Sequence, residues 1–279
     1  MTETPILDPE TGTVYNRIKA LMDRLRDPET GCPWDKVQTF KSIAPYTIEE
    51  AYEVEDAVIR GDMNDLKDEL GDLLFQVLFH SKMAEDEGAF NLDDVCERLI
   101  EKMVKRHPHI FSENTNTMQA DRPKWEDIKA AERDAKTANA VRNGHLPSLL
   151  DDVALNLPAL LRAEKLQKRA ARSGFDWPDI AGVTDKISEE FDEVKDAIST
   201  MDSNHIEDEI GDLLFSVTNL ARKLKINPES ALRRTNKKFT KRFQYIEQKA
   251  AQANRSVSDM ELEEMERHWQ EAKVSPFEL

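Results

Sequence analysis

Hydrophobic residues recur at every third or fourth position through much of the chain, which is the spacing of one face of an amphipathic helix. Between residues 13 and 26, for example, the apolar side chains fall at Val14, Ile18, Leu21, Met22 and Leu25. No segment alternates convincingly between apolar and polar residues, as a half-buried strand does. The pattern therefore predicts an all-α protein.

Capping residues and helix breakers divide this pattern into helices. Thr47 and Glu50 have the spacing of a capping box, Asp62 can cap the next helix, and Pro158 is expected to kink or break a later one. Segment 27–39, with two prolines and a glycine, is expected to be a loop, serving as a structural plug or as a substrate lid. The expected helices span residues 13–26, 47–61, 62–88, 91–106, 123–129, 148–172, 182–200, 202–225, 228–254 and 258–273.

One segment of the chain is repeated: it occurs at Glu49–Val77 and again at Glu189–Val217, with a constant offset of 140 residues. Both copies read E-E-x-x-E and, sixteen residues on, E-x-x-D. Eight of the eleven residues at the end of each copy are identical, so the pattern is a duplicated unit rather than a product of acidic composition. We expect two modules, 1–137 and 148–279, joined by a linker at 138–147, where Asn143-Gly144 and Pro147 interrupt the helical pattern.

The overall charge limits the partners of this protein. With 55 acidic and 39 basic residues the net charge is -16, which argues against a nucleic acid or an anionic membrane as the main partner. A small polyphosphate remains compatible, because bound cations can reverse the local field. Two widely separated cysteines, and no recognisable targeting or membrane-spanning segment, predict a soluble protein of the reducing cytoplasm.

The repeated carboxylates have the spacing of a metal site. Residues three apart are neighbours on a helix, so Glu190 pairs with Glu193, and Glu209 pairs with Asp212 on the following helix. If the two helices pack antiparallel, the pairs face each other beside an apolar seam, where four carboxylates cannot all stay ionised without cations. Mg²⁺, and Mn²⁺ as its substitute, suit such oxygen ligands. The equivalent set in the first copy is Glu50, Glu53, Glu69 and Asp72.

Other interpretations of the acidic residues are a solvent-exposed acidic face and a di-iron bundle. The di-iron chemistry uses Glu-x-x-His, and none of the six histidines lies three positions after a glutamate, so we discount it. The pair His107 and His109 can ligate a metal, or can simply end a helix and help to pack its neighbours.

Basic residues follow each acidic copy in the same order. Lys102 and Arg106 recur as Lys238 and Arg242, and Trp125 with Lys129 recurs as Trp269 with Lys273. These residues are either ordinary surface charge or the contacts to a phosphate-bearing ligand, with the tryptophan stacking a base or closing the core. Because no phosphate-binding glycine loop of the G-x-x-x-x-G-K-[ST] type is present, phosphate capture would rely on metal and basic side chains.

The duplicated motif resembles that of the MazG family of nucleoside triphosphate pyrophosphohydrolases, in its two-domain bacterial form. Further matches are Gly31–Asp35 (GCPWD), Ile43–Tyr46 (IAPY), Arg106–Phe111 (RHPHIF) and Gly174–Trp177 (GFDW). The resemblance implies helices from paired modules that form a four-helix site, usually in a homodimer. It also implies Mg²⁺-dependent hydrolysis of nucleoside triphosphates, ATP among them, to the monophosphate and pyrophosphate.

The resemblance also assigns residues. It implies that Glu190, Glu193, Glu209 and Asp212 are the catalytic metal ligands, and the same match gives Glu50, Glu53, Glu69 and Asp72 as a second set in the first copy. The expected substrate contacts are Lys186, Glu189, Asn219, Lys238, Arg242, Trp269 and Lys273. His205 stands where some relatives have a lysine, which affects the expected pH dependence and phosphate affinity. The proposed chemistry is in-line attack by water, and the general base stays unassigned.

The two copies are not equal at one position. Asn219 lies seven residues after Asp212, on the same helix face, and can hydrogen-bond a ligand, whereas the first copy has Phe79 there. We therefore predict that the second module is the main catalyst. Two alternative functions stay open at this point, namely a non-catalytic tandem helical interaction protein and a pyrophosphatase restricted to dUTP or dCTP.

Overall fold

The computed structural model describes residues 12–111, 148–151 and 153–274 of the chain, and these residues form helices and connecting loops without a β-strand. They fall into two compact units, residues 1–134 and 135–279. The first unit contains α1 (Val14–Leu25), a short 3₁₀ turn (Asp35–Val37), α2 (Phe40–Arg60), α3 (Met63–Asp86), α4 (Leu92–Arg106) and α5 (Pro108–Phe111). The second contains α7 (Ala159–Arg172), α8 (Ile180–Thr200), α9 (Ser203–Lys223), α10 (Pro228–Gln252), a 3₁₀ turn (Val257–Asp259) and α11 (Leu262–Val274).

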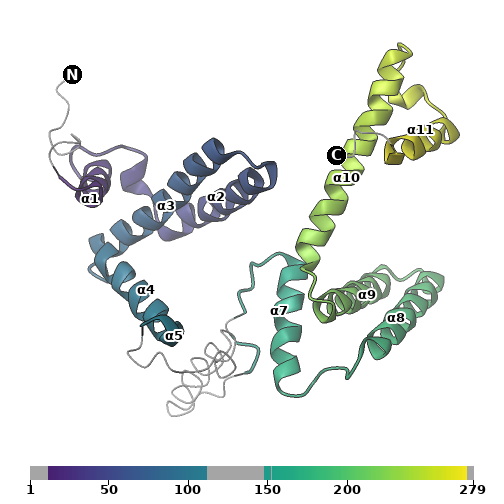
Figure 1. Ribbon diagram of the computed structural model, residues 1–279, viewed down its shortest axis with the longest axis horizontal. Helices are drawn as coiled ribbons and strands as arrows, with labels where there is room; N and C mark the ends of the chain where they lie inside the picture. The colour runs from purple at the N-terminus through teal and green to yellow at the C-terminus, as the bar shows by residue number, and fades with distance from the viewer. Residues whose placement is uncertain (1–11, 112–147, 152, 275–279) are drawn as a thin grey trace. The chain divides into compact units, whose positions relative to one another are not determined.

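The two units repeat one plan, which can be followed in Figure 1. A helix (α1 or α7) is followed by a loop, then by a hairpin of two long helices (α2–α3 or α8–α9), and then by a further helix (α4 or α10). The two helices of each hairpin pack along each other, and α1 packs on α3 as α7 packs on α9. The prediction of an all-α protein is therefore confirmed, and the duplicated motif lies on the two hairpins.

The start of α2 differs from the prediction. The helix begins at Phe40 rather than after Thr47, because Thr39 and Ser42 form the capping box and Pro45 lies inside the helix. The early turns are retained because Ile43 is fully buried in the core of the first unit, and that burial favours helical structure on both sides of the proline. Asp62 does cap α3, as predicted.

Two further boundaries need correction. The expected helix 148–172 is only Ala159–Arg172, since Pro158 breaks the pattern completely and occupies the N-cap of α7. The last helix begins at Leu262 instead of Ser258, because residues 257–259 form a separate 3₁₀ turn. The predicted helix at 123–129, the linker at 138–147 and the residues Trp125 and Lys129 lie outside the described residues.

Both hairpins turn through a single residue in the left-handed backbone region. In the first hairpin this residue is Gly61, with a φ of 72°, and in the second it is Met201, with a φ of 55°. Asp62 and Asp202 follow directly, and each accepts hydrogen bonds from the backbone N–H groups of the second and third residues of the next helix, α3 or α9. The two hairpins therefore share the same corner geometry.

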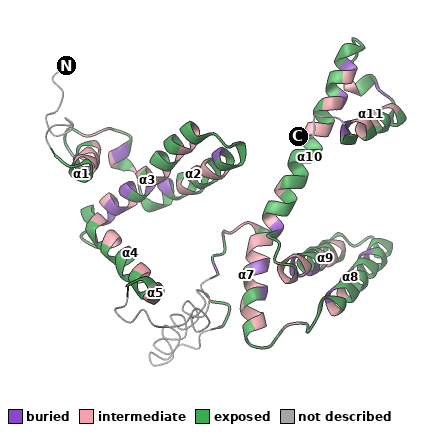
Figure 2. Ribbon diagram, viewed as in Figure 1, coloured by how far each residue is buried: buried purple, intermediate pink, exposed green. Residues whose placement is uncertain are grey.

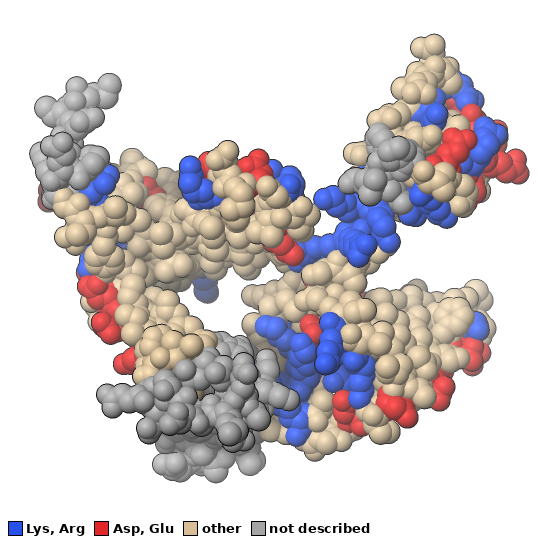
Figure 3. All heavy atoms as spheres, in the orientation of Figure 1, with Lys and Arg blue, Asp and Glu red and all other residues tan. Residues whose placement is uncertain are grey.

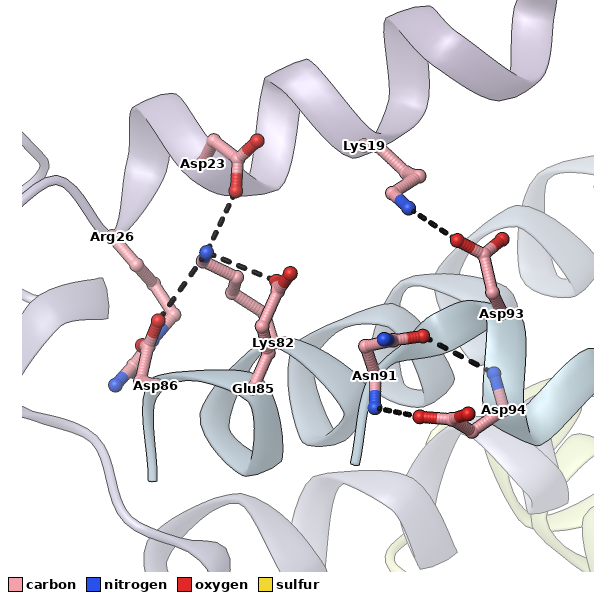
Figure 4. A network of polar contacts seen from close by, with 9 residues as sticks. All are labelled: Lys19, Asp23, Arg26, Lys82, Glu85, Asp86, Asn91, Asp93 and Asp94. Carbon is pink, nitrogen blue, oxygen red and sulfur yellow. Dashed lines mark hydrogen bonds and ion pairs between the residues drawn. The ribbon is translucent and has the colours of Figure 1, made fainter. Parts of the chain in front are cut away.

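The core of the first unit lies between α1, α2 and α3. Met22, Ile43, Leu78, Phe79 and Met83 form its buried cluster. Ion pairs at the edge of this core fasten α1 to the hairpin (Figure 4): Lys82 Nζ lies 2.7 Å from Asp23 Oδ1 and 3.3 Å from Asp86 Oδ1, and Arg26 also binds Asp86. In the second unit, a smaller cluster of Ile246, Ala250 and Met260 joins α10 to α11.

Each hairpin leaves apolar side chains exposed. In Figure 2 much of both hairpins has the green of exposed residues. Leu74 is 46% exposed and its counterpart Leu214, 140 residues later, is 52% exposed. The pairs Val58 with Ile198, Leu70 with Ile210, and Val77 with Val217 are likewise exposed in both units. Exposed apolar patches of this kind mark interaction surfaces. None of the described helices combines the length and hydropathy that a membrane crossing requires.

Candidate metal and nucleotide site

The hairpin of the second unit brings acidic residues of the repeated motif together. Glu190 and Glu193 lie on α8, and Glu209 lies on α9. One carboxylate oxygen from each lies within 4.8 Å of the other two, a separation that a single cation can bridge. Asp212, one helical turn after Glu209, is exposed and is not part of this close group.

The first hairpin forms a related but different group. There Glu50 on α2 meets Glu69 and Asp72 on α3, again with one oxygen each within 4.8 Å of the others. In this copy the fourth motif residue, Glu53, is the one outside the close group. The structure thus brings together three carboxylates of each predicted set of four, and a different residue is left out in each copy.

The environment of the second cluster fits a cation. Glu190 is 5% exposed, and its buried Oε2 has no hydrogen-bond partner among the described residues. Burial raises the pKa of Glu193, and the neighbouring carboxylates of Glu190 and Glu209 raise it further, against the lowering effect of Lys186. An unpartnered carboxylate oxygen is costly to bury. A hard divalent cation among these oxygens would both satisfy it and reduce the repulsion.

The carboxylates of the first cluster also repel one another. Burial raises the pKa of Glu50, and the nearby carboxylates of Asp72 and Glu53 add to the effect. Burial likewise raises the pKa of Glu69, with contributions from Glu53 and Asp65. This cluster therefore has the same chemical reason to take up a cation.

Lys186 supplies a positive charge at the second cluster. Its Nζ lies 2.8 Å from Glu189 Oε1 and 2.8 Å from Glu190 Oε1, one turn away on the same helix. These hydrogen bonds raise the pKa of Lys186, so its ammonium stays charged at neutral pH. Glu189 is thus a partner of Lys186 beside the carboxylate cluster. On the facing helix, His205 Nδ1 lies 3.5 Å from Glu209 Oε1.

Asn219, predicted to contact the substrate, is buried in α9 within a polar chain. Its Oδ1 accepts a hydrogen bond of 2.8 Å from Arg222 Nε, while Arg222 Nη2 donates to Asp176 Oδ1 at 2.6 Å. Lys223 also pairs with Asp176 and donates to the carbonyl of Trp177. These hydrogen bonds and ion pairs fasten the Gly174–Trp177 loop to α9. The GFDW motif marks this loop in the sequence, but no sequence signal pointed to a role for Asp176 or Arg222.

Replacing Asp176 with asparagine is expected to lower the free energy of unfolding by about 1–3 kcal/mol at neutral pH, because two charge-assisted interactions are lost. Burial opposes ionisation of Asp176, but hydrogen bonds from Arg222 and Lys223 outweigh it and lower the pKa. The stabilisation is therefore complete above pH ~4 and disappears as the pH falls through the lowered pKa. Urea unfolding of both proteins at several pH values measures the effect.

Asp185→Asn is the matched control for Asp176→Asn, because Asp185 is an exposed aspartate of α8 in the same unit. We expect its unfolding midpoint to follow that of the unmodified protein at every pH. A difference between Asp176→Asn and the unmodified protein that persists unchanged at pH 2 would show that the loop is not held by the ionised carboxylate.

The other basic residues predicted to contact nucleotide, Lys238, Arg242 and Lys273, lie on α10 and α11 of the second unit. Arg242 of α10 sits over the ring of Trp269 of α11, with its guanidinium carbon 5.5 Å from the ring centroid, and Phe239 packs on the same indole at 5.2 Å. Lys238 lies one turn before Arg242, and Lys273 Nζ donates to Gln270 Oε1. Figure 3 shows blue basic side chains gathered over α10, in a chain whose net charge is strongly negative.

Of the equivalent features in the first unit, the described residues include the basic pair of α4. Lys102 and Arg106 do lie on one helix, α4, at the expected spacing. His107 Nδ1 lies 2.7 Å from the carbonyl of Met103, which corresponds to the helix-end interpretation of this residue. The side chain of His109 lies outside the described residues.

Comparison with known proteins adds independent information. The model of the MazG nucleotide pyrophosphohydrolase domain matches the chain twice, at residues 38–111 and 181–246. The matches cover both hairpins except for Ile180, the first residue of α8. A nucleoside triphosphate pyrophosphohydrolase of Escherichia coli K12 is 46% identical over 270 residues, covering 95% of this chain and 98% of that protein. The MazG nucleoside triphosphate pyrophosphohydrolase/pyrophosphatase of Thermotoga maritima is 39% identical over 264 residues, covering 95% and 97%.

A third relative, the uncharacterised protein YabN of Bacillus subtilis, is 44% identical over 264 residues, which is 93% of this chain but only 51% of that longer protein. Two separate domain matches and near-complete coverage of the Escherichia coli and Thermotoga relatives agree with the duplicated hairpins of the structure. The chain therefore belongs to the MazG family, as a protein with two tandem MazG domains.

Proposed function

We propose that this protein hydrolyses nucleoside triphosphates to nucleoside monophosphates and pyrophosphate, with the second unit as the main catalytic site. One observation carries the proposal: three carboxylates converge on the α8–α9 hairpin, and one of their oxygens is buried without a partner. Membership of a family whose relatives are named for this activity supports it.

Mg²⁺ is the cation that best suits this donor set, and Mn²⁺ is its expected substitute. Glu190, Glu193 and Glu209 would hold it, with Asp212 available from the next turn of α9. When bound, it would supply Lewis acidity toward phosphate oxygens and a more acidic water. Asp212 can join the group by a change of side-chain rotamer, because it lies on the same helix face as Glu209.

Basic side chains of the second unit would hold the phosphates. The ammonium of Lys186 already lies beside the cluster, and Lys238, Arg242 and Lys273 would add positive charge from α10 and α11. Trp269 offers an indole ring for the base. Glu189 would orient Lys186. Asn219, whose Oδ1 accepts a hydrogen bond from Arg222, would direct its Nδ2 group toward the ligand.

A second copy of the chain is the expected partner of the exposed hairpin faces. The same positions are apolar and exposed in both units, at Leu74 and Leu214 for example. Two hairpins that bury these faces against each other would form a four-helix site, as a homodimer. The free cysteines Cys32 and Cys96 fit a reducing, cytoplasmic environment.

The test is a substrate panel. Purified protein is incubated with each common ribonucleoside and deoxyribonucleoside triphosphate and Mg²⁺, and pyrophosphate and orthophosphate are measured separately. We expect pyrophosphate release that stops when a chelator removes the metal and returns with Mg²⁺ or Mn²⁺. Release from dUTP or dCTP alone would indicate a narrow pyrophosphatase, and no release from any nucleotide would favour an interaction protein.

A further inference from the structure

Four of the proposed substrate contacts come from two helices that must be held in a fixed relation to each other. Lys238 and Arg242 lie on α10, and Trp269 and Lys273 lie on α11, which folds back along the end of α10 (Figure 1). An apolar cluster joins the two helices, and Trp269 packs against it. Whatever else fixes α11 on α10 therefore also fixes the position of the indole ring.

A neighbouring face of α11 carries a row of ionisable side chains. Glu264, His268 and Glu271 are spaced by four and three residues, so they share one face of the helix. His268 lies at the centre of the row: its Nδ1 is 2.8 Å from Glu271 Oε2, and its Nε2 is 4.0 Å from Glu264 Oε1. Its side chain is only 15% exposed. In the doubly protonated ring, each nitrogen carries a hydrogen toward one of the two carboxylates.

Each of these carboxylates also binds a residue outside α11. Tyr245 of α10 donates a hydrogen bond of 3.5 Å to Glu271 Oε2, the same oxygen that His268 binds. Arg255, in the loop after α10, places its Nη2 2.5 Å from Glu264 Oε1. We call Tyr245, Glu271, His268, Glu264 and Arg255 the polar seam, because together they run from α10 through α11 to the loop.

His268 is the residue that the two carboxylates of the polar seam share. Its hydrogen bond lowers the pKa of Glu271 against the effect of burial, and the charges of Lys249 and Arg267 lower that pKa further. An ionised Glu271 is the stronger acceptor for the hydrogen bonds of the seam. An apolar side chain in place of the imidazole would remove the connection between Glu264 and Glu271.

The position of the Trp269 ring depends on the rotation of α11 about its own axis. Trp269 directly follows His268, and successive residues of a helix are about 100° apart. The indole contacts Arg242 and Phe239 of α10, so side chains define its place on that helix. A side chain that reaches ~6 Å from the helix axis moves by roughly 1 Å when the helix rotates by about 10°. A displacement of that size is enough to impair a well-fitted site.

We propose that His268 is a positioning residue for the proposed substrate site, because it joins Glu264 to Glu271 and so fixes the rotation of α11 that presents Trp269 to the base. His268 itself does not touch the substrate. The role of Trp269 rests on the proposed function, whereas the link from the polar seam to the Trp269 ring can be measured without nucleotide. Because the apolar cluster still holds α11, loss of His268 is expected to turn the helix rather than detach it.

The first experiment follows the Trp269 ring in the full chain without nucleotide. Labelling with 5-fluorotryptophan gives one ¹⁹F resonance for each of the four tryptophans, and Trp269→Phe identifies the resonance of that ring. We expect His268→Leu to shift the Trp269 resonance, while the resonances of Trp34 and Trp177, which lie in other parts of the chain, stay in place. His268→Lys keeps a cation within reach of both carboxylates and is expected to return the resonance toward its original position.

The second experiment measures turnover. His268→Leu is expected to raise the KM for a nucleoside triphosphate on the order of tenfold, within the range for loss of one stacking partner, and to leave kcat within about twofold of its original value. Trp269→Leu is expected to raise the KM at least as much, and the double variant no further, because His268 acts through that ring. Glu263→Leu, which changes an exposed residue of the same helix, is the control and is expected to leave both the resonance and the KM unchanged.

Two results would overturn the inference: a Trp269 resonance that His268→Leu leaves in place, or effects of His268→Leu and Trp269→Leu on KM that add in full. If His268→Leu unfolds the second unit, Glu264→Gln, which weakens one link of the polar seam, replaces it; a smaller shift of the Trp269 resonance is then expected, and no shift overturns the inference. A chain that releases no pyrophosphate, but whose Trp269 resonance responds to His268→Leu, would contradict the proposed function and support the positioning role, so the two failures are told apart.

Discussion

Replacing Glu209 with glutamine is expected to abolish pyrophosphate release. Glu209 is the residue through which α9 joins the close carboxylate group, and an amide has neither the charge nor the second acceptor oxygen of the carboxylate. Loss of a group that only orients a metal ligand typically costs 10–100-fold, so loss of a ligand itself is expected to lower kcat/KM by at least ~100-fold. The rate of pyrophosphate release with saturating Mg²⁺ measures the effect.

Two further variants decide whether this loss is specific. Glu207→Gln removes an exposed carboxylate from the same helix outside the cluster and is expected to keep full activity. Glu69→Gln makes the matched change in the first unit, where we expect little effect on turnover. The assignment of catalysis to the second unit is wrong if Glu209→Gln remains active and Glu69→Gln is inactive.

Introducing lysine at Leu74 and Leu214 together is expected to convert the protein to monomers and to remove its activity. Both side chains are exposed on the hairpins at equivalent positions, and the proposed dimer buries them. An ammonium buried in an apolar interface without a partner costs several kcal/mol, enough to weaken the dimer by more than ~100-fold. Light scattering after size exclusion is expected to give the mass of two chains for the unmodified protein and of one 32.0 kDa chain for the variant.

The control for this prediction is Leu262→Lys, which adds the same charge at an exposed leucine of α11 away from the hairpins. It is expected to remain dimeric and active. An unmodified protein that runs as a monomer while it releases pyrophosphate would contradict the dimer and would require a site formed within a single chain. Circular dichroism of the double variant tests whether its helices are retained.

The duplicated hairpins were predictable because they depend on short-range signals. Helical periodicity placed α3 and α9, and Asp62 was correctly identified as the cap of α3. The start of α2 was missed because two capping boxes compete within eight residues, and the choice depends on the burial of Ile43 against α1 and α3. Long-range packing of this kind is not encoded in local spacing.

In the candidate site, too, sequence spacing predicted part of the arrangement, and the neighbouring side chains determined the rest. The spacing of the motif correctly predicted that carboxylates of successive helices converge, but it did not predict that Asp212 in one copy and Glu53 in the other lie outside the close groups. That difference depends on rotamers and on neighbours, such as Lys186 beside Glu190 and Gln76 beside Glu50. Arg222, which also binds Asn219 one turn earlier in α9, reaches Asp176 across 46 positions of sequence, beyond the reach of a periodicity argument.

The corner of the second hairpin shows how firmly that hairpin is held. A left-handed backbone at a methionine costs roughly 1–2 kcal/mol more than at glycine, yet Met201 adopts the conformation that Gly61 adopts in the first hairpin. The packing of the two helices therefore imposes the left-handed backbone conformation at the corner, whichever residue lies there. The corner can therefore hold either a glycine or a methionine while the two facing helices keep their register, and with it the position of the carboxylates.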